Sequence, residues 1–93
     1  MRLKGKVAIV TGGGTGLGRG IALMFGREGT SVVVNGRRLG PIEATAKAIT
    51  DAGGRAMAVP GDVTVAADIQ RLIRTTVDSF GQLDVLVNNA GII

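Results

Sequence analysis

Glycine crowds the stretch from Gly12 to Gly18, in which five of seven residues are glycine. A turn with so few side chains exposes its backbone N–H groups, and a helix that begins there adds the positive end of its dipole. This chemistry suits a pyrophosphate. The candidate binding residues are Gly12, Gly14, Thr15, Gly16, Leu17 and Gly18. The alternative is a tight strand-to-helix connection that binds nothing.

The spacing of these glycines separates three kinds of phosphate-binding turn. A G-x-G-x-x-G turn that starts at Gly14 needs glycine at position 19, where the chain has Arg19. A P-loop that starts at Gly13 needs lysine at position 19 and serine or threonine at position 20. The chain has Arg19 and Gly20 instead. The pattern that remains is Thr-Gly-x-x-x-Gly-x-Gly, on Thr11, Gly12, Gly16 and Gly18.

Two arginines, Arg37 and Arg38, bear on which dinucleotide would bind. An NAD site usually has an acidic residue about 20 positions after the glycines, which holds the ribose 2′-hydroxyl, whereas arginine accommodates a 2′-phosphate. Gly36 occupies that place, eighteen residues after Gly18, and no carboxylate lies beside it. The guanidinium group suits phosphate because it is planar and permanently charged. The sequence therefore predicts NADP(H) in preference to NAD(H), and the alternative is a solvated turn.

Two more turns follow apolar runs later in the chain. Asp62 and Val63 come after Ala56–Val59, and the tetrapeptide Asn88-Asn89-Ala90-Gly91 comes after Leu83–Val87. Read from their chemistry alone, aspartate, asparagine and glycine at such places are common turn formers.

Alternating strands and helices must position these turns. Apolar runs predict strands over Val7–Val10, Ser31–Val34, Ala56–Val59 and Leu83–Val87. Apolar stripes at helical spacing lie between them. This alternation predicts an α/β fold: a single Rossmann-like unit over residues 1–93, with a parallel sheet in the order 3-2-1-4 and three crossover helices. The four turns would then share the edge of the sheet where strands end, which is where such folds bind ligands.

The helices have recognisable limits and inner faces. Gly29 closes the first helix, Pro41 suits the first turn of the second, and Thr64 is a good N-cap for the third. The expected inner face of the second helix is Ile42, Thr45, Ala46, Ile49 and Ala52. That of the third is Ile69, Leu72, Ile73, Thr76, Val77 and Phe80.

Together these motifs resemble the N-terminal half of a short-chain dehydrogenase/reductase, of the type that includes 3-oxoacyl-carrier-protein reductases and glucose dehydrogenases. The resemblance covers residues 1–93 and implies that the Asp62 carboxylate meets the adenine amino group, with Val63 lining the adenine pocket. It also implies that Asn88 ties strand ends together, and that Asn89, Ala90 and Gly91 run beside the nicotinamide ribose. Thr15 departs from it, since many relatives that use NADP carry a basic residue there.

The resemblance also implies which parts are missing. Members of the family are more than twice this length, and their catalytic serine and Tyr-x-x-x-Lys pair come later. This chain has no tyrosine and no histidine, so we expect no catalytic residue and no hydride transfer by these 93 residues alone. The predicted function is the coenzyme-binding half of an NADP(H)-dependent dehydrogenase/reductase that acts on an alcohol or ketone, with the catalytic half missing. The alternative is a non-catalytic nucleotide-binding or self-assembling module.

Composition narrows the partners. The net charge is +4, but the basic residues are scattered and there is no tryptophan or tyrosine to stack on bases, which disfavours nucleic acid. Without cysteine there is no thiolate metal site, and the chain fits a cytoplasmic location. No apolar run approaches the ~20 residues of a membrane span. The last strand would leave an apolar edge, so we expect a homo-oligomer formed through that strand or the face beside it.

Overall fold

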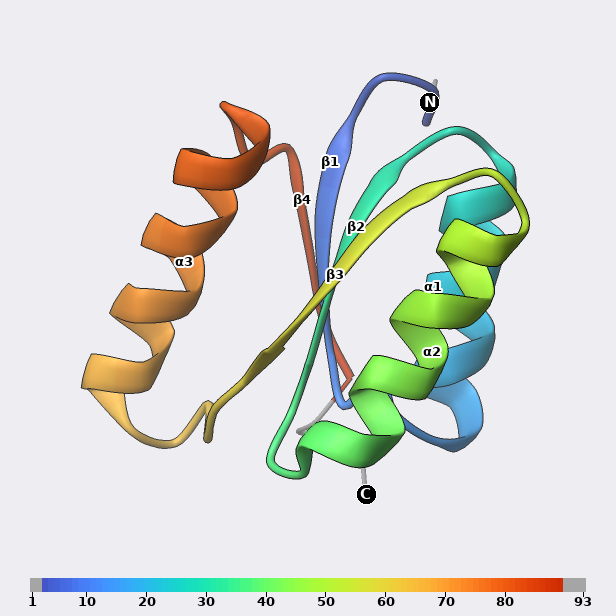
Figure 1. The fold of residues 1–93 in the computed structure, drawn as a ribbon. Coiled ribbons are helices and arrows are strands. Elements are labelled where there is room, and N and C mark those ends of the chain that lie inside the picture. Colours follow the sequence, from blue (N-terminus) through green and yellow to red (C-terminus); the bar gives the residue numbers. More distant parts are fainter. Residues whose placement is uncertain (1–2, 90–93) are drawn as a thin grey trace.

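Strands and helices alternate from one end of the chain to the other in a computed structural model that describes residues 3–89. The elements are β1 (Val7–Thr11), α1 (Gly16–Arg27), β2 (Ser31–Gly36), α2 (Leu39–Asp51), β3 (Arg55–Pro60), α3 (Ala66–Phe80) and β4 (Val85–Asn88). The strands are parallel and form one sheet in the order β3-β2-β1-β4. In Figure 1, α1 and α2 cover one face of the sheet and α3 covers the other. The predicted fold class is confirmed.

The register of the central strands brings their carboxyl ends to one edge. Val10 of β1 lies opposite Val34 of β2 on one side and Val87 of β4 on the other. Every residue of β1 is buried, as expected for a strand with neighbours on both sides and helices on both faces. Thr11, the last residue of β1, therefore stands at the middle of the edge where the chain turns into the glycine stretch.

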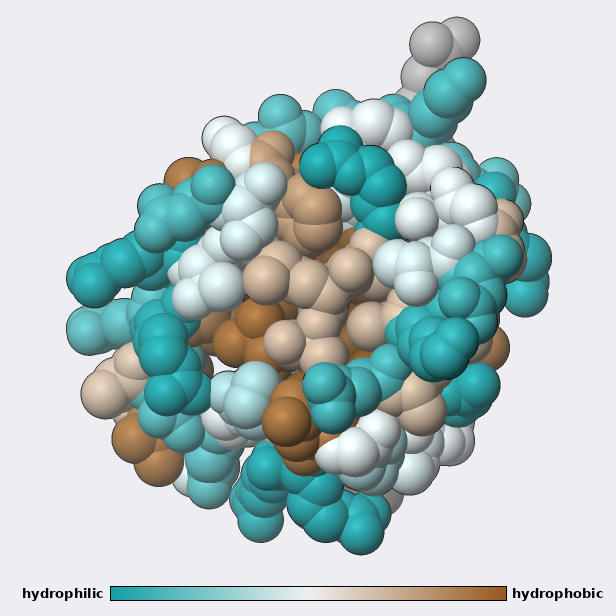
Figure 2. All heavy atoms as spheres, viewed as in Figure 1, coloured by the Kyte–Doolittle hydropathy of each residue, from teal (hydrophilic) through white to brown (hydrophobic). Residues whose placement is uncertain are grey.

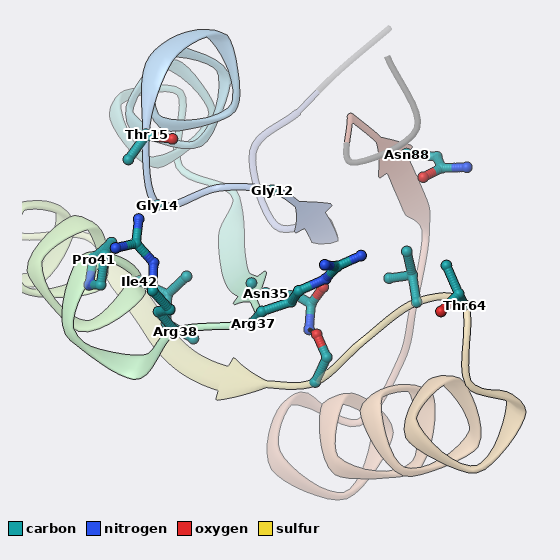
Figure 3. Close-up of a pocket in the computed structure, with 13 residues that line it drawn as sticks. Gly12, Gly14, Thr15, Asn35, Arg37, Arg38, Pro41, Ile42, Thr64 and Asn88 are labelled. Carbon is teal, nitrogen blue, oxygen red and sulfur yellow. Dashed lines mark hydrogen bonds between the residues drawn. The ribbon is translucent and has the colours of Figure 1, made fainter. Parts of the chain in front are cut away.

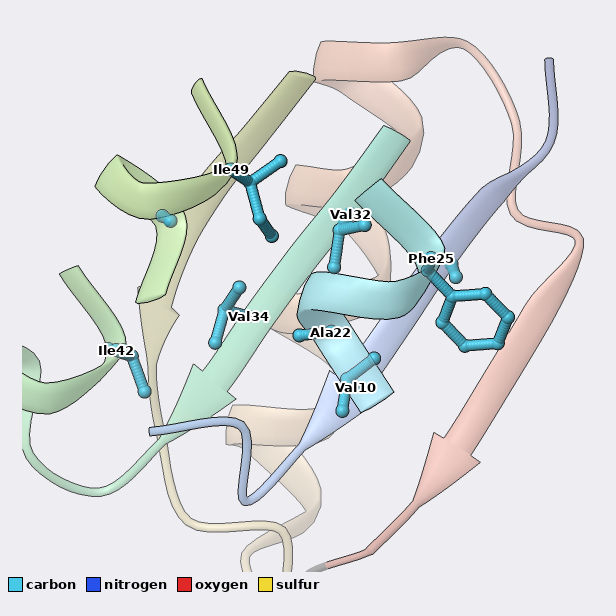
Figure 4. Packing of buried hydrophobic residues seen from close by; sticks show 9 residues of the cluster. Val10, Ala22, Phe25, Val32, Val34, Ile42 and Ile49 are labelled. Atoms are coloured by element: carbon cyan, nitrogen blue, oxygen red, sulfur yellow. The ribbon is translucent and has the colours of Figure 1, made fainter. Parts of the chain in front are cut away.

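Alternate residues of the strands feed two separate cores. Val10, Val32 and Val34 pack against α1 and α2, where Phe25 and Ile49 join them (Figure 4). The residues one position away point to α3 instead. There Ile9, Val33 and Val59 form a smaller cluster with Leu72 of that helix. Burial of aliphatic side chains on both faces is what fixes the sheet between its helices, at roughly 25 cal/mol per Å² of apolar surface.

The edge strand β3 faces the viewer in Figure 1. In the same view, Figure 2 shows an apolar centre flanked by hydrophilic surface. Ala56 and Ala58 belong to the α1 and α2 side and Met57 to the α3 side, and all three are only partly buried. The sheet is thus covered on its faces and remains partly open along this strand.

The expected inner face of α3 is only half correct. Leu72 and Thr76 are buried, whereas Ile69, Ile73 and Val77 remain 36%, 39% and 41% exposed. The apolar stripe is wider than the strip of α3 that touches the sheet, so its outer half has no layer to pack against. In α2 the expected face is confirmed except at Ala52, which is exposed because α2 ends at Asp51.

Two local predictions about boundaries are wrong. Thr64 is not the N-cap of α3, because α3 begins at Ala66 and the Thr64 hydroxyl donates to Asp62 Oδ1 at 2.7 Å. The turn therefore uses this hydroxyl for itself. The fourth strand is Val85–Asn88 and not Leu83–Val87, since its ladder with β1 starts at Val85.

Candidate functional site

A cleft of about 560 Å³ opens at the edge of the sheet where the strands end. Each of the four strand-end turns contributes to its wall (Figure 3). The lining residues are Gly12, Gly14, Thr15, Asn35, Gly36, Arg37, Arg38, Pro41, Ile42, Gly61, Val63, Thr64 and Asn88. The convergence expected from parallel topology is therefore present in the structure.

The glycine turn folds back tightly on the start of α1. Gly12 has φ +63°, a left-handed conformation that glycine adopts without strain. Gly18 is buried beneath it, and a β-carbon at position 18 would overlap the Gly12 carbonyl oxygen. Asn89 Nδ2 donates to that same oxygen at 3.2 Å, which ties the turn to the end of β4. The Gly12 oxygen is thus engaged inside the fold, while Gly14 and Thr15 line the cleft.

Two helices direct their N-termini at this edge. α1 begins at Gly16 and α2 at Leu39, beside the turns that line the cleft. Neither helix has an acidic residue in its first turn, and neither has a side-chain cap. Their first N–H groups and the positive ends of their dipoles are therefore available to an anion.

The turn after β2 brings positive charge to the cleft. In Figure 3 the Arg37 guanidinium reaches across the middle of the cleft, and that of Arg38 lies on the side of Gly14 and Pro41. Arg37 Nε is 3.7 Å from Asp62 Oδ2, and the Arg37 side chain remains 75% exposed. Gly36 packs closely against Ile42, because a β-carbon there would lie 2.7 Å from Ile42 Cγ2 and would require that side chain to shift.

The turn after β3 organises itself around a carboxylate. Asp62 Oδ1 accepts hydrogen bonds from the Thr64 hydroxyl at 2.7 Å and from the Thr64 backbone N–H at 2.9 Å. These two bonds, aided by the Arg37 guanidinium, hold the pKa of Asp62 below its ordinary value against the opposing effect of burial. The Asp62 N–H in turn donates to Asp68 Oδ2 of α3 at 2.8 Å. Asp62 is therefore ionised at neutral pH.

The end of β4 is joined to the end of β1 through side chains. The Thr11 hydroxyl lies 3.2 Å from the Val87 carbonyl oxygen and 3.3 Å from Asn88 Oδ1. These contacts fit the role that the resemblance gives to Asn88, namely to tie strand ends together. Asn88 also reaches the cleft wall.

The cleft contains some of the sequence-predicted residues and not others. Those in its wall are Gly12, Gly14, Thr15, Arg37, Arg38 and Val63. Gly16, Leu17, Gly18, Asp62 and Asn89 lie beside the wall without forming it. Ala90 and Gly91 lie outside the described residues. Sequence reasoning missed Asn35, Pro41, Ile42 and Thr64, because only the contact between strand ends and α2 reveals that they share a surface.

The groups that line this cleft suit an anionic ligand. Within residues 3–89, no group of three or more acidic, histidine or cysteine side chains could hold a metal ion. Over the same residues, no helix is long and apolar enough to cross a bilayer. The cleft offers helix N-termini without side-chain caps, two guanidiniums and a glycine turn without side chains, all of which suit phosphate groups.

Comparisons with known proteins agree with this chemistry. A family model described as short chain dehydrogenase matches residues 6–93. An uncharacterized oxidoreductase of Methylorubrum extorquens is 46% identical over 92 residues, which cover 98% of this chain and 37% of that protein. The crystal structure of a hydroxysteroid dehydrogenase from Escherichia coli superposes with a TM-score of 0.91 at 37% identity, over 94% of this chain and 37% of that one.

A shorter relative is of similar size to this chain. The short-chain dehydrogenase/reductase homolog YusS of Bacillus subtilis is 41% identical over 93 residues, which cover 99% of this chain and 85% of that protein. By contrast, the chain spans little more than a third of the length of the first curated relatives that it matches.

Proposed function

Because the chain belongs to the short chain dehydrogenase family, whose members use a nicotinamide dinucleotide, we propose that it binds NADP(H) in preference to NAD(H). The observation that carries the proposal is the single cleft to which all four strand-end turns contribute. When bound, the cofactor would supply hydride-transfer chemistry at its nicotinamide ring.

The glycine turn and the two helix N-termini would hold the pyrophosphate. A β-carbon at Gly14 would lie 2.8 Å from Pro41 Cβ, so the turn packs directly against α2. The Gly13 N–H is bonded to the Asn35 carbonyl oxygen, so the anion would meet the N–H groups that follow it in the turn. Neither α1 nor α2 has a first-turn carboxylate that would repel the anion. Both features support a phosphate site at this point.

The preference for a 2′-phosphate rests on the turn after β2. Position 36 is a glycine and brings no carboxylate to hold a 2′-hydroxyl, and a side chain there would require Ile42 to shift. Arg37 is mostly exposed and Arg38 stands on the glycine-turn side of the cleft. In the proposed complex Arg38 supplies the positive charge that Thr15 does not.

Calorimetric titration with NADPH and NADH tests this function. A charge-assisted contact to the 2′-phosphate contributes about 1.5–3 kcal/mol, so NADPH should bind about tenfold or more tightly than NADH. Arg37→Met should remove part of this difference, and the double substitution Arg37→Met with Arg38→Met most of it. Arg27→Met serves as the matched control, because Arg27 lies in the last turn of α1, away from the cleft. Equal binding of the two cofactors, or tighter binding of NADH, would refute the preference.

A self-assembling module is the second candidate. The apolar side chain of Leu86 on the edge strand β4, which is 55% exposed, is the observation that favours it.

Catalysis by these residues alone is a separate question. With no tyrosine or histidine in its sequence, the chain offers neither the family's general acid/base nor the commonest substitute. We propose that these 93 residues bind cofactor without oxidising NADPH. Ketone-dependent loss of NADPH absorbance by the pure chain would contradict this. We propose reduction of a ketone to an alcohol only for a longer protein that contains these residues.

The surface available for self-assembly lies on the outer side of β4. Leu86 is 55% exposed and faces the α3 side of the sheet, because its partner in the ladder, Ile9, belongs to the core beneath α3. α3 is right-handed and crosses from β3 to β4, so the residue after each buried position points toward β4. Ile73 follows Leu72 and Val77 follows Thr76. We propose that Leu86 and this side of α3 form one apolar contact surface.

A further inference from the structure

Asn35 is a buried polar residue whose hydrogen-bonding capacity is only partly used inside the protein. It is the fifth residue of β2, is 2% exposed and lines the cleft. Its amide nitrogen donates to the Val59 carbonyl oxygen at 3.0 Å and to the Gly61 carbonyl oxygen at 3.4 Å. Both N–H groups of the amide are therefore engaged with β3 and the turn that follows it.

These two bonds fix which way the amide points. If the group were turned over, its oxygen would face the carbonyl oxygens of Val59 and Gly61, and two pairs of acceptors would oppose each other. The amide oxygen must therefore point away from β3.

The amide oxygen opens onto the cleft. Among residues 3–89, none donates to it, whereas no fully buried side-chain oxygen or nitrogen of the described residues lacks a partner. The oxygen must therefore retain some of the small exposed area of Asn35, and the surface that Asn35 lines is the cleft. This acceptor reaches its surroundings only through the cleft, so a ligand that fills the cleft must offer it a donor in place of water.

The position of Asn35 indicates which part of a dinucleotide supplies that donor. This step rests on the proposed function, in which Arg37 and Arg38 meet the 2′-phosphate. That phosphate is carried by the adenosine ribose, so the base attached to it lies toward β3, against Gly61 and Val63. Asp62 stands between them, and the resemblance gives its carboxylate to the adenine amine. That exocyclic amine has two N–H groups, so a second acceptor beside this turn can take the other one.

We propose that Asn35 is a specificity-determining residue whose amide oxygen accepts a hydrogen bond from the adenine amine of the bound cofactor. The site then discriminates against a base that carries an oxygen in place of the amine, because that oxygen would face the Asn35 oxygen and neither could donate. Rejection of this kind is strong, since it leaves buried polar groups unpaired.

The test compares binding of NADPH with that of its hypoxanthine analogue, in which a carbonyl replaces the amine. The wild-type chain should bind NADPH about tenfold more tightly than the analogue. Asn35→Ala should weaken NADPH binding and lower this ratio about threefold, whereas the part of the preference that the Asp62 carboxylate supplies remains. Gln70→Ala is the matched control, because it removes an exposed amide from α3 and should leave the ratio at its wild-type value.

A second measurement needs no variant, since loss of the bonds to β3 could unfold Asn35→Ala. In spectra of the ¹⁵N-labelled wild type, the Asn35 side-chain amide signals should shift more with NADPH than with the analogue. A ratio unchanged by Asn35→Ala, or equal shifts with both cofactors, would overturn the role of Asn35 while leaving the proposed function intact. Failure of both cofactors to bind would refute the proposed function itself.

Discussion

At the scale of single residues, Asp84 holds the beginning of β4 against β1. Its Oδ2 accepts from the Val7 backbone N–H at 2.8 Å and from Gln82 Nε2 at 2.6 Å. The Val7 N–H, and then Gln82 and Lys6, hold the pKa of Asp84 below its ordinary value, although burial opposes them. The carboxylate thus supplies an acceptor to the first N–H of a buried strand, which would otherwise have none.

This arrangement predicts how stability depends on pH. Because the pKa of Asp84 is lower in the folded chain than in the unfolded chain, its contribution is present above the unfolded pKa and is lost as pH falls through the acid range. Asp84→Asn should therefore lower the melting temperature at pH 7 and flatten its decline between pH 5 and pH 3. Asp78→Asn, on the exposed side of α3, is the control. If the melting temperatures of wild type and Asp84→Asn fall equally steeply between pH 5 and pH 3, Asp84 does not have this role.

Asparagine shows what residue-level prediction from sequence can and cannot reach. Asn88 and Asn89 stand in a recognisable tetrapeptide, and the structure gives each of them a contact that joins β4 to the end of β1 or the glycine turn. Asn35 stands at the end of an apolar run with no pattern around it. Its importance depends on β3 lying beside β2, which only the assembled sheet reveals.

At the scale of secondary-structure elements, the glycines of α1 have unequal surroundings. A β-carbon at Gly26 would lie 2.7 Å from Ile49 Cγ2 of α2, whereas one at Gly20 would meet nothing within 4 Å. The close packing of α1 on α2 thus requires glycine at one position only. The sequence alone does not distinguish the two.

Alanine substitutions test this difference. Gly20→Ala should stabilise the fold by about 0.5–1 kcal/mol, because alanine favours a helix and nothing obstructs it. Gly26→Ala should destabilise it by about 1 kcal/mol, since overpacking against Ile49 outweighs the same helical gain. Urea denaturation followed by circular dichroism measures both. Equal effects of the two substitutions would show that α1 and α2 are less tightly packed than described.

The parallel sheet was predictable because strand and helix patterns alternate along the chain, and its order was predictable because dinucleotide-binding folds share one. The limits of the elements were not predictable. Thr64 has the chemistry of an N-cap, but a carboxylate two residues earlier attracts its hydroxyl. Val77 continues the apolar stripe of α3, yet the sheet beneath it is too narrow to bury the whole stripe. In both cases a neighbour that is not visible in the local pattern decides the outcome.

At the scale of the whole molecule, the open side of β4 predicts self-association. An edge strand with an exposed apolar side chain pairs readily with another chain, and a charge on that edge prevents it. The pure chain should form a dimer in light scattering. Leu86→Lys should shift it to a monomer, and Met24→Lys on the exposed side of α1 should not. A wild-type monomer at high concentration, or a dimer that survives Leu86→Lys, would argue against this surface.

The four strand-end turns form one dinucleotide site in this account, and mapping of amide chemical shifts during NADPH titration tests that claim most directly. The account predicts shifts in all four turns, over residues 12–18, 35–38, 61–64 and 88–89, with a common dissociation constant. It predicts unchanged signals in the groove at the far end of α1 and α2, which Gly26, Ala48 and Gly53 line. Shifts confined to that groove, or absent from one of the four turns, would contradict it.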